Sequence, residues 1–279
     1  VRAVLASVRK GDLDVRAVEH LVRLGPETSG VLLALRDEIR RDEQIRVAAE
    51  ALARLECDKL EPYLLATLQR AERPGTRRAV YAILAAHGTP FSFPHLARLM
   101  DANPPKLKRP ADDAFTAILR RHGTRPAHRE AWAAGVGRTP ETRARIVSCL
   151  SASAAAAALA VLEVQLGENP SLDPAILCGI ARLVNAGHPL ASLSAIRSLL
   201  DHDDSRLRRE AALILGIVHD SESLPALIEM LEESDIGVRA NVHWTLRNIS
   251  GLELEPVPQR WKLWLDEERA WWRAEGLDL

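Results

Sequence analysis

The sequence predicts an all-α protein built as an α-solenoid, a stack of short helical hairpins. Three observations carry this prediction. The composition is rich in Ala, Leu and Arg and only 4% aromatic, which favours helices over sheets. With 279 residues and 47% hydrophobic content, the chain can bury a large core, which excludes a disordered protein. A basic marker residue also returns about every 31 residues, the period of a helical repeat.

The marker is expected near the start of the second helix of each hairpin. An apolar residue usually precedes it by one position and a small or apolar residue follows it by three, which places both on one helical face. Alanine replaces the basic residue once. The positions define about eight hairpins: Arg16, Arg46, Arg77, Lys108, Arg143, Ala175, Arg208 and Arg239.

An apolar helical pattern precedes each marker segment and predicts the first helix of the hairpin. The clearest case is Leu224–Leu231, with apolar residues at i, i+3, i+4 and i+7. Earlier first helices are predicted at Val31–Ile39, Pro62–Leu68, Pro94–Met100, Pro126–Ala134, Ala154–Leu166 and Leu190–Leu200. Helix ends are expected at the glycines Gly25, Gly88, Gly123, Gly187 and Gly251. One hairpin cannot enclose its own apolar face, so neighbouring hairpins must stack.

The most regular motif is Asp-x-x-Val-Arg, or a close variant, followed by an alanine-rich helix, as in Asp235–Ile249, Asp204–Gly216 and Asp42–Leu55. With this motif the chain resembles the HEAT-repeat family, most closely the short bacterial repeats of the phycobilin-lyase type. The resemblance extends over residues 12–250 and weakens at Ala175 and where Pro110 interrupts the pattern. It implies an α-solenoid that binds other macromolecules.

The segment after the last repeat is rich in tryptophan and contains Pro258, Trp261 and Trp264 in a Pro-x-x-Trp-x-x-Trp pattern. This pattern resembles a terminator of such arrays. Because the last repeat leaves an apolar face without a neighbour, a helix carrying Trp261, Trp264 and Trp272 can cover it. We therefore expect a single solenoid domain over residues 1–250 and a capping segment over 251–279. A tryptophan-based partner site is the alternative.

Four of the marker arginines follow an aspartate by four residues. This spacing suits an ion pair at the start of a helix and the helix dipole, worth a few tenths of a kcal/mol when exposed. We expect a structural ladder composed of Asp12, Arg16, Asp42, Arg46, Asp204, Arg208, Asp235 and Arg239.

The charge of the chain is uneven along its length. Residues 70–145 hold 15 Lys and Arg against 6 Asp and Glu, and residues 201–279 hold 9 against 17. In a stacked array, equivalent second-helix residues line a concave surface. We expect a basic groove formed by Arg77, Arg78, Lys108, Arg109, Arg143 and Arg145, in which Arg77, Lys108 and Arg143 are the freer cations because no acid precedes them by four residues. Solvated surface is the alternative.

The sequence contains no recognisable catalytic, metal or cofactor motif, so none of the three is expected. The nine histidines form no His-Glu-x-x-His motif, and no glycine-rich phosphate loop or Gly-x-Ser-x-Gly elbow occurs. Cys57, Cys149 and Cys178 are too scattered for a disulfide framework or a thiolate site. Cys149 and Cys178 are expected to be small buried residues.

We therefore expect a non-catalytic scaffold or adaptor that binds another protein through the basic concave groove. The formal net charge of −1 argues against coating of nucleic acid, although nucleic-acid binding remains an alternative. Alkylpurine DNA glycosylases use a HEAT-like solenoid with an acidic residue and tryptophans in a basic concave groove. By resemblance to them, a repair site would consist of Asp113 with Trp132 and Trp244. However, Asp112 and Asp113 follow Pro110 and are expected in a helix first turn, where acids serve the dipole. A bilin-lyase-like enzyme or chaperone is a further alternative.

No stretch approaches the roughly 20 apolar residues of a membrane helix, and the longest is Ala152–Leu162. The chain shows no signal-peptide pattern. We expect a cytoplasmic monomer without a membrane span.

Overall fold

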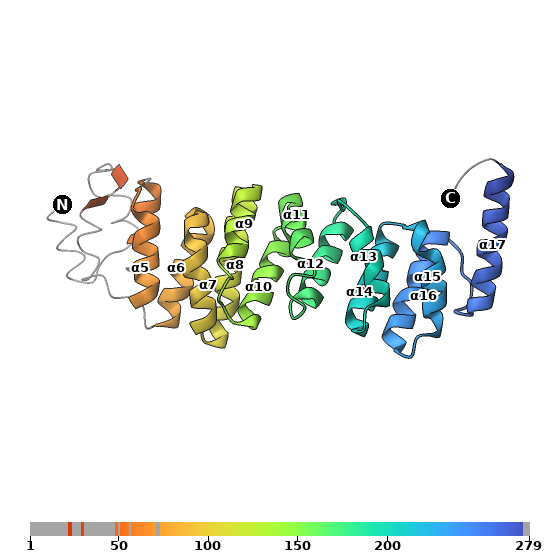
Figure 1. Cartoon of the computed structure of the whole chain (residues 1–279). Coiled ribbons are helices and arrows are strands. Elements are labelled where there is room, and N and C mark those ends of the chain that lie inside the picture. The colour runs from red at the N-terminus through yellow and green to blue at the C-terminus, as the bar shows by residue number, and fades with distance from the viewer. Residues whose placement is uncertain are drawn as a thin grey trace. The chain divides into compact units, whose positions relative to one another are not determined.

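The structure is a computed structural model that describes residues 22–23, 29–30, 48–49, 51–55, 57–70 and 73–275. These residues form helices and connecting loops, with no strand among them. The chain divides into two compact units, residues 1–153 (unit 1) and 154–279 (unit 2). Each unit is a stack of helical hairpins (Figure 1). The prediction of an all-α solenoid is confirmed in both units.

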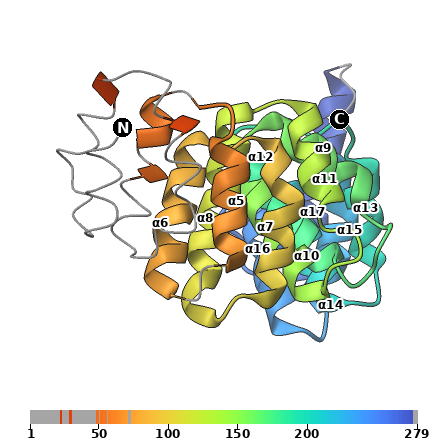
Figure 2. The same ribbon diagram turned by 90° about the vertical axis from the view of Figure 1, so that its left-hand side faces the viewer.

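In unit 1 the described hairpins are α5 (Leu60–Arg70) with α6 (Pro74–His87), α7 (Phe93–Ala102) with α8 (Pro105–His122), and α9 (Arg125–Ala133) with α10 (Pro140–Ala152). A 3-10 turn, η1 (Pro90–Ser92), precedes α7. α6 packs against α8, and α8 against α10. Figure 2 shows α6 and α8 on one side of α5 and α7. We call α6, α8 and α10 the second-helix layer of unit 1.

In unit 2 the hairpins are α11 (Ala156–Gln165) with α12 (Asp173–Asn185), α13 (Ser194–Ser198) with α14 (Ser205–Ile217), and α15 (Leu224–Glu229) with α16 (Ile236–Ser250). The 3-10 turns η2 (Leu199–Asp201), η3 (Ser221–Ser223) and η4 (Met230–Glu232) flank the short first helices. α14 packs against both α12 and α16, so these three form the second-helix layer of unit 2. The final helix, α17 (Pro258–Ala274), packs against α15.

Proline and polar caps explain where the helices begin. Proline occupies the first turn of α6, α7, α8, α9, α10, α12, α15 and α17, where a backbone N–H has no helical partner. Thr139 caps α10 by accepting a hydrogen bond from the Thr142 N–H at 3.3 Å, and Asp235 caps α16 by accepting one from the Gly237 N–H at 2.7 Å. Local sequence therefore determines most helix starts.

Glycines end the helices in two different ways. Gly123 and Gly251 take left-handed conformations, with φ of 39° and 74°, and cap α8 and α16 as predicted. Gly88 ends α6 in an extended conformation instead. A Cβ at Gly88 would lie 2.9 Å from the Ile118 Cδ1 atom, so this glycine allows α8 to approach closely. Gly25 lies outside the described residues.

Pro110 does not interrupt its helix, contrary to the sequence expectation. α8 runs from Pro105 to His122 and contains Pro110 in its second turn. The buried side chains of Leu107, Ala111 and Phe115 hold the helix in place on both sides of the proline. Asp112 is therefore a mid-helix residue, and the prediction that it lies in a first turn is wrong.

Candidate functional site

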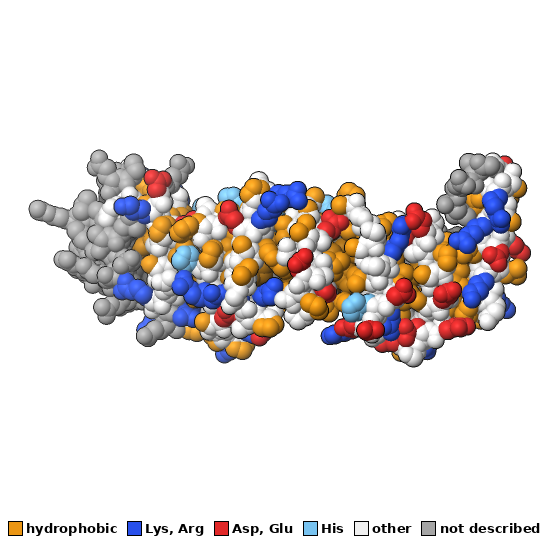
Figure 3. Space-filling view, viewed as in Figure 1, with side chains coloured by type: hydrophobic (Ala, Val, Ile, Leu, Met, Phe, Trp, Pro, Cys, Tyr) orange, Lys and Arg blue, Asp and Glu red, His pale blue; other side chains and the backbone are white. Residues whose placement is uncertain are grey.

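The second helices α6, α12, α14 and α16 carry little exposed negative charge. α6 and α16 contain no acidic residue. The acidic residue of α12, Asp173, is buried, and that of α14, Glu210, is mostly covered, with 17% of its side chain exposed. Five acids of unit 2 lie instead at the loop edge of the hairpins, where they line an open depression: Asp201, Asp203, Glu229, Glu232 and Glu233. Figure 3 shows acidic side chains gathered along one edge of the molecule. The acidic total of residues 201–279 therefore does not describe the second-helix layer of unit 2.

Arg145, predicted to line the basic groove, joins α10 to α8 instead. Its guanidinium donates two hydrogen bonds to the Asp112 carboxylate at 2.7 and 3.3 Å, and others to the backbone oxygens of Lys108 at 2.9 Å and Met100 at 3.0 Å. Only 14% of the side chain is exposed. Burial raises the pKa of Asp112, and the bonded Arg145 opposes that shift. Arg145 therefore joins two successive repeats. We call the contact between two successive second helices a seam.

Lys108 and Arg143 are not the freer cations that the sequence suggested. Lys108 forms an ion pair with Glu141 of α10, and this contact lowers the pKa of the Glu141 carboxyl. The Arg143 guanidinium lies 6.0 Å from the centre of the Trp132 ring, within the range of a cation–π contact. The partner of each cation lies on another helix: Glu141 for Lys108 and Trp132 for Arg143. The spacing of residues along one helix does not reveal such partners.

Arg78 and Arg109 are the exposed cations of the predicted groove. They lie on the adjacent helices α6 and α8 and make no hydrogen bond or ion pair with any residue that the structure describes. Arg77 beside them is half-buried. Two acids of this region are engaged by other residues: Asp101 accepts a hydrogen bond from the Thr139 hydroxyl at 2.8 Å, and Asp112 binds Arg145. Asp113, one turn after Arg109, is exposed. The positive charge of Arg78 and Arg109 therefore stays available at the surface.

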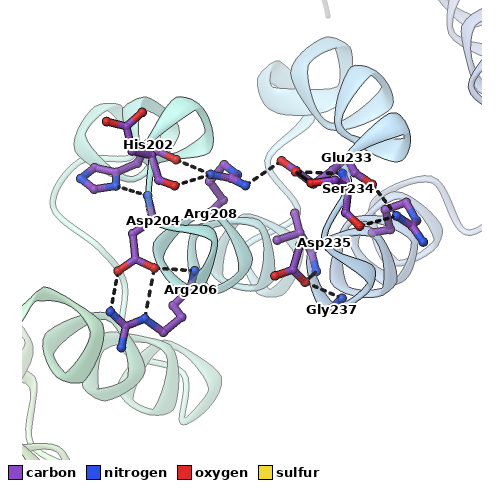
Figure 4. A network of polar contacts seen from close by, with 11 residues as sticks. His202, Asp204, Arg206, Arg208, Glu233, Ser234, Asp235 and Gly237 are labelled. Atoms are coloured by element: carbon purple, nitrogen blue, oxygen red, sulfur yellow. Dashed lines mark hydrogen bonds and ion pairs between the residues drawn. The ribbon is translucent and has the colours of Figure 1, made fainter.

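The predicted ladder has a different geometry in unit 2. Asp204 pairs with Arg206 at 2.7 Å rather than with Arg208, and its bonds to Arg206 lower the pKa of Asp204 to about 2. Arg208 donates to the backbone oxygens of His202 and Asp203 at 2.6 and 2.9 Å. It also pairs with Glu233 at 2.9 Å, before the next second helix (Figure 4).

Asp235 and Arg239 follow the same rule. Asp235 accepts hydrogen bonds from the N–H groups that begin α16, and Arg239 donates to the Ser234 backbone oxygen at 2.9 Å. In the two couples that the structure describes, the predicted Asp–Arg pairing is therefore wrong, because the aspartate caps its helix while the arginine bonds to the preceding loop. Asp12, Arg16, Asp42 and Arg46 lie outside the described residues.

The tryptophans of α17 occupy different environments. Trp261 is fully buried, donates from Nε1 to the Glu255 backbone oxygen at 2.9 Å, and packs edge-on against His243 at 6.3 Å. Trp264 meets the Trp261 ring edge-on at 5.7 Å and is partly exposed. Trp272 donates to the Glu268 carboxylate at 2.9 Å and is also partly exposed. The burial that a cap requires is concentrated at the start of α17.

The residues suggested for glycosylase chemistry are not gathered in one pocket. Trp132 lines a small pocket with Gly135, Val136, Arg143 and Ile146, and Asp113 is not part of its lining. Burial raises the pKa of the Cys149 thiol to about 12, which keeps it protonated and unreactive at neutral pH.

Among the residues that the structure describes, no group of three or more His, Cys, Asp or Glu side chains is arranged to hold a metal ion. Within the same residues, no helix combines the length and the apolar character needed to cross a bilayer.

Sequence reasoning missed the ion pairs between successive second helices. Arg145 and Asp112 are 33 residues apart, and so are Glu141 and Lys108. Opposite charges separated by about one repeat period were the signal that could have revealed them. Trp244 of α16, which the sequence suggested only as part of a repair site, is 42% exposed on the second-helix layer of unit 2.

Comparison with known proteins agrees with the repeat architecture. Residues 173–247, which span α12 to α16 up to Arg247, match the family model described as HEAT repeats. Two crystal structures of engineered proteins, both targets of the Northeast Structural Genomics Consortium, are similar to this chain. The first is 15% identical to this chain, with a TM-score of 0.36, and the alignment covers 84% of this chain and 74% of the engineered protein. The second is 18% identical, with a TM-score of 0.30, and the alignment covers 84% of this chain and 97% of the engineered protein.

The comparison with curated proteins returned no match. The family match does not extend to a subclass, so the likeness to phycobilin-lyase-type repeats stays a prediction. Residues 173–247 are therefore similar to HEAT repeats, and both units are built of stacked helical hairpins.

Proposed function

We propose that this protein is a non-catalytic scaffold that binds an acidic segment of another protein along its second-helix layer. Solenoids of this family present extended surfaces to macromolecular partners. The observation that carries the proposal is that Arg78 and Arg109, on the adjacent helices α6 and α8, are exposed and have no hydrogen-bond or ion-pair partner among the described residues.

Pairing within unit 1 supports this choice of surface. Asp101 and Asp112 are engaged by side chains of α10 and of the loop that precedes it, and Glu141 is engaged by Lys108 of α8, so these three acids do not neutralise the two arginines. Asp113, one turn after Arg109 on α8, is exposed and is the remaining acid of this helix. A guanidinium offers five N–H donors in a planar fork that matches a carboxylate. Acidic side chains of a partner are therefore the groups that this surface recognises best.

The test is a charge-reversal pair with a matched control. Arg78→Glu with Arg109→Glu changes the second-helix layer, whereas Arg125→Glu with Arg129→Glu makes the same charge change at exposed positions of α9. Binding of a fluorescein-labelled glutamate-rich peptide is measured by fluorescence polarisation at 150 mM salt. We expect at least a tenfold weaker affinity for the first variant and less than a twofold change for the control.

Equal losses in both variants would show a general charge effect and contradict the proposal. Duplex DNA of equal charge is measured in parallel. If DNA binds more tightly than the peptide, with a steep salt dependence that is lost in the Arg78 and Arg109 variant, nucleic-acid binding replaces protein binding as the function.

A further inference from the structure

The open depression at the loop edge of unit 2 lies between two successive hairpins. Its lining comes from η2, the loop before α14 and α14 itself in one hairpin, and from α15, η4 and the loop before α16 in the next. Its volume is about 580 Å³, within the range of roughly 300 to 1,000 Å³ that is usual for ligand clefts. An occupant of this depression is independent of the proposed function, which concerns the cations of unit 1.

Most of the negative charge in the depression is not neutralised. Four of its five carboxylates are exposed and make no hydrogen bond or ion pair with any residue that the structure describes: Asp201, Asp203, Glu229 and Glu232. The fifth, Glu233, pairs with Arg208. By contrast, Asp220 and Glu222 of the same unit both pair with Arg197. The depression therefore holds carboxylates that remain available to cations from outside.

The carboxylates are spread along the depression rather than gathered at one point. Among the described residues, no three of them are arranged to hold a metal ion. Separate carboxylates suit separate cations, because each charge pair needs its own close contact. Lys and Arg side chains that follow one another along a peptide meet this requirement.

Arg208 holds the two sides of the depression together. Its guanidinium donates to the backbone oxygens of His202 and Asp203 at 2.6 and 2.9 Å, and it pairs with Glu233 at 2.9 Å. These contacts tie the loop before α14 to the loop before α16 (Figure 4). Only 15% of the Arg208 side chain is exposed, so its charge is used inside the protein. A surface that is already fixed loses little entropy when a partner binds.

Apolar side chains also line the depression. Leu200 is buried, whereas Ala226 and Met230 are partly exposed. Methionine is unbranched and polarisable, so it adapts its shape to an apolar side chain placed against it. A peptide can place a bulky apolar side chain between its cations, whereas a free polyamine carries its amines on a bare methylene chain. The mixed lining therefore favours a peptide over a polyamine.

We infer that this depression is a docking site for a basic segment of another protein. Lys or Arg side chains of that segment pair with the four exposed carboxylates, and one bulky apolar side chain packs against Met230. Charge complementarity determines this choice of occupant, because unpaired carboxylates attract cationic side chains and repel nucleic acid.

The experiment selects ligands on the intact chain from a phage-displayed library of twelve-residue peptides built from Lys, Arg, Leu, Phe, Ser and Gly. A library without Asp or Glu keeps acidic ligands of the Arg78 and Arg109 surface out of the selection. Enriched peptides are synthesised with a fluorescein label, and their affinities are measured by fluorescence polarisation at 150 mM salt. We expect enrichment of peptides in which several Lys or Arg residues flank a Leu or Phe.

Two double variants with the same change of charge make the result specific. Asp203→Asn with Glu232→Gln neutralises two carboxylates of the depression, whereas Asp266→Asn with Glu267→Gln neutralises two exposed carboxylates of α17. We expect the first variant to bind the enriched peptides about fivefold more weakly, and the second to change affinity less than about twofold. Circular dichroism checks that each variant keeps its helical content.

A further pair of measurements tests the apolar contact. Replacing the Leu or Phe of the peptide by alanine should weaken binding to the wild type and have little further effect on Met230→Gln, since that variant has already lost the contact. Equal losses for both proteins would contradict the role of Met230.

The inference is overturned if no peptide is enriched, or if the two double variants lose equal affinity. Displacement of the peptide by an equimolar amount of spermidine would make a free polyamine the ligand instead. Binding of Ca²⁺ that is tighter than that of any peptide, and lost in Asp203→Asn with Glu232→Gln, would make the depression a metal site.

Discussion

Two seams between second helices, one in each unit, solve the same packing problem with different chemistry. The seam between α8 and α10 in unit 1 uses ion pairs, chiefly Arg145 with Asp112 at 2.7 Å. The seam between α14 and α16 in unit 2 uses neutral hydrogen bonds to backbone oxygens, with Thr245 as the buried donor, and close approach at Gly216. The α8–α10 seam depends on ion pairs between the helices themselves, whereas between α14 and α16 the ion pair of Arg208 with Glu233 lies at the loop before α16 and the helices meet by close fit.

The difference has a consequence for the surface. An ionic seam removes cations from the second-helix layer, as it does with Arg145 and Lys108. Between α14 and α16, Arg208 is likewise engaged by Glu233 before α16, whereas Arg209 keeps 45% of its side chain exposed. The number of Lys and Arg residues in a segment therefore does not by itself determine how many unpaired cations that segment exposes at its surface. Pairing across repeats decides which charges a partner can reach.

The largest expected effect comes from breaking the fit of the neutral seam. Gly216→Val places a Cβ 2.7 Å from the Thr245 hydroxyl oxygen and the Trp244 ring, so α16 must move away. We expect a loss of about 3 kcal/mol in the free energy of unfolding, measured by urea denaturation. Ala240→Val, at an exposed position of α16, should cost only about 0.6 kcal/mol from helix propensity. Similar losses in both would mean that the seam is not closely packed.

Removing the charge of the ionic seam should have the next largest effect. Arg145→Met leaves the half-buried Asp112 carboxylate without its cation and is expected to cost about 2 kcal/mol. The double variant Asp112→Asn with Arg145→Met should recover part of this loss, since no unpaired charge remains. Urea denaturation of the four proteins in this cycle measures the coupling. A coupling energy near zero would show that the contact between Arg145 and Asp112 does not stabilise the seam.

A smaller loss is expected when one neutral hydrogen bond is removed. Thr245→Val keeps the shape of the side chain but cannot donate to the Ala212 backbone oxygen, and we expect a cost of about 1 kcal/mol. Hydrogen–deuterium exchange should accelerate in α14 and α16. Thr67→Val is the matched control, because the Thr67 hydroxyl bonds to Tyr63 within its own helix and bridges no seam. Equal exchange in α14 and α16 before and after the change would contradict this role.

The smallest effect concerns the acid sensitivity of unit 1. His128 is buried, with Nδ1 2.8 Å from the Thr124 backbone oxygen and Nε2 3.1 Å from the Ser153 hydroxyl. Burial lowers the pKa of His128, so the fold favours the neutral ring. Stability from this residue is therefore complete above the ordinary histidine pKa and falls as the pH drops below it, by at most about 1.4 kcal/mol per pH unit.

His128→Gln should flatten the pH dependence of the free energy of unfolding between pH 7 and 5. His87→Gln replaces an exposed histidine of α6 and should leave that dependence unchanged. The reverse result, a steeper dependence in His128→Gln, would mean that the charged ring is the form the fold prefers.

Much of the fold was predictable because it depends on local signals. Proline in first turns, caps such as Asp235, and left-handed glycines such as Gly251 act within a few residues of the helix end. Pro110 is the exception, since tertiary packing around Leu107 and Phe115 keeps α8 continuous where the local signal favoured an interruption.

The candidate site was less predictable. Arg78 and Arg109 were expected at the surface and are exposed, whereas Arg145 and Lys108 were expected there and are engaged in the seam. A one-dimensional charge pattern identifies cations but not their partners, because these partners stand one whole repeat away. Trp244 entered only as a weak catalytic candidate, and its packing against α14 depends on Gly216 beneath it.

From its sequence alone this chain is an array of helical hairpins, because a periodic apolar pattern can be satisfied only by stacking similar neighbours. Which arginines face solvent, which glycine admits a tryptophan and which acid meets which base are decided by the tertiary structure. These features depend on how closely successive helices approach, a distance set by side chains about thirty residues apart and by no single segment.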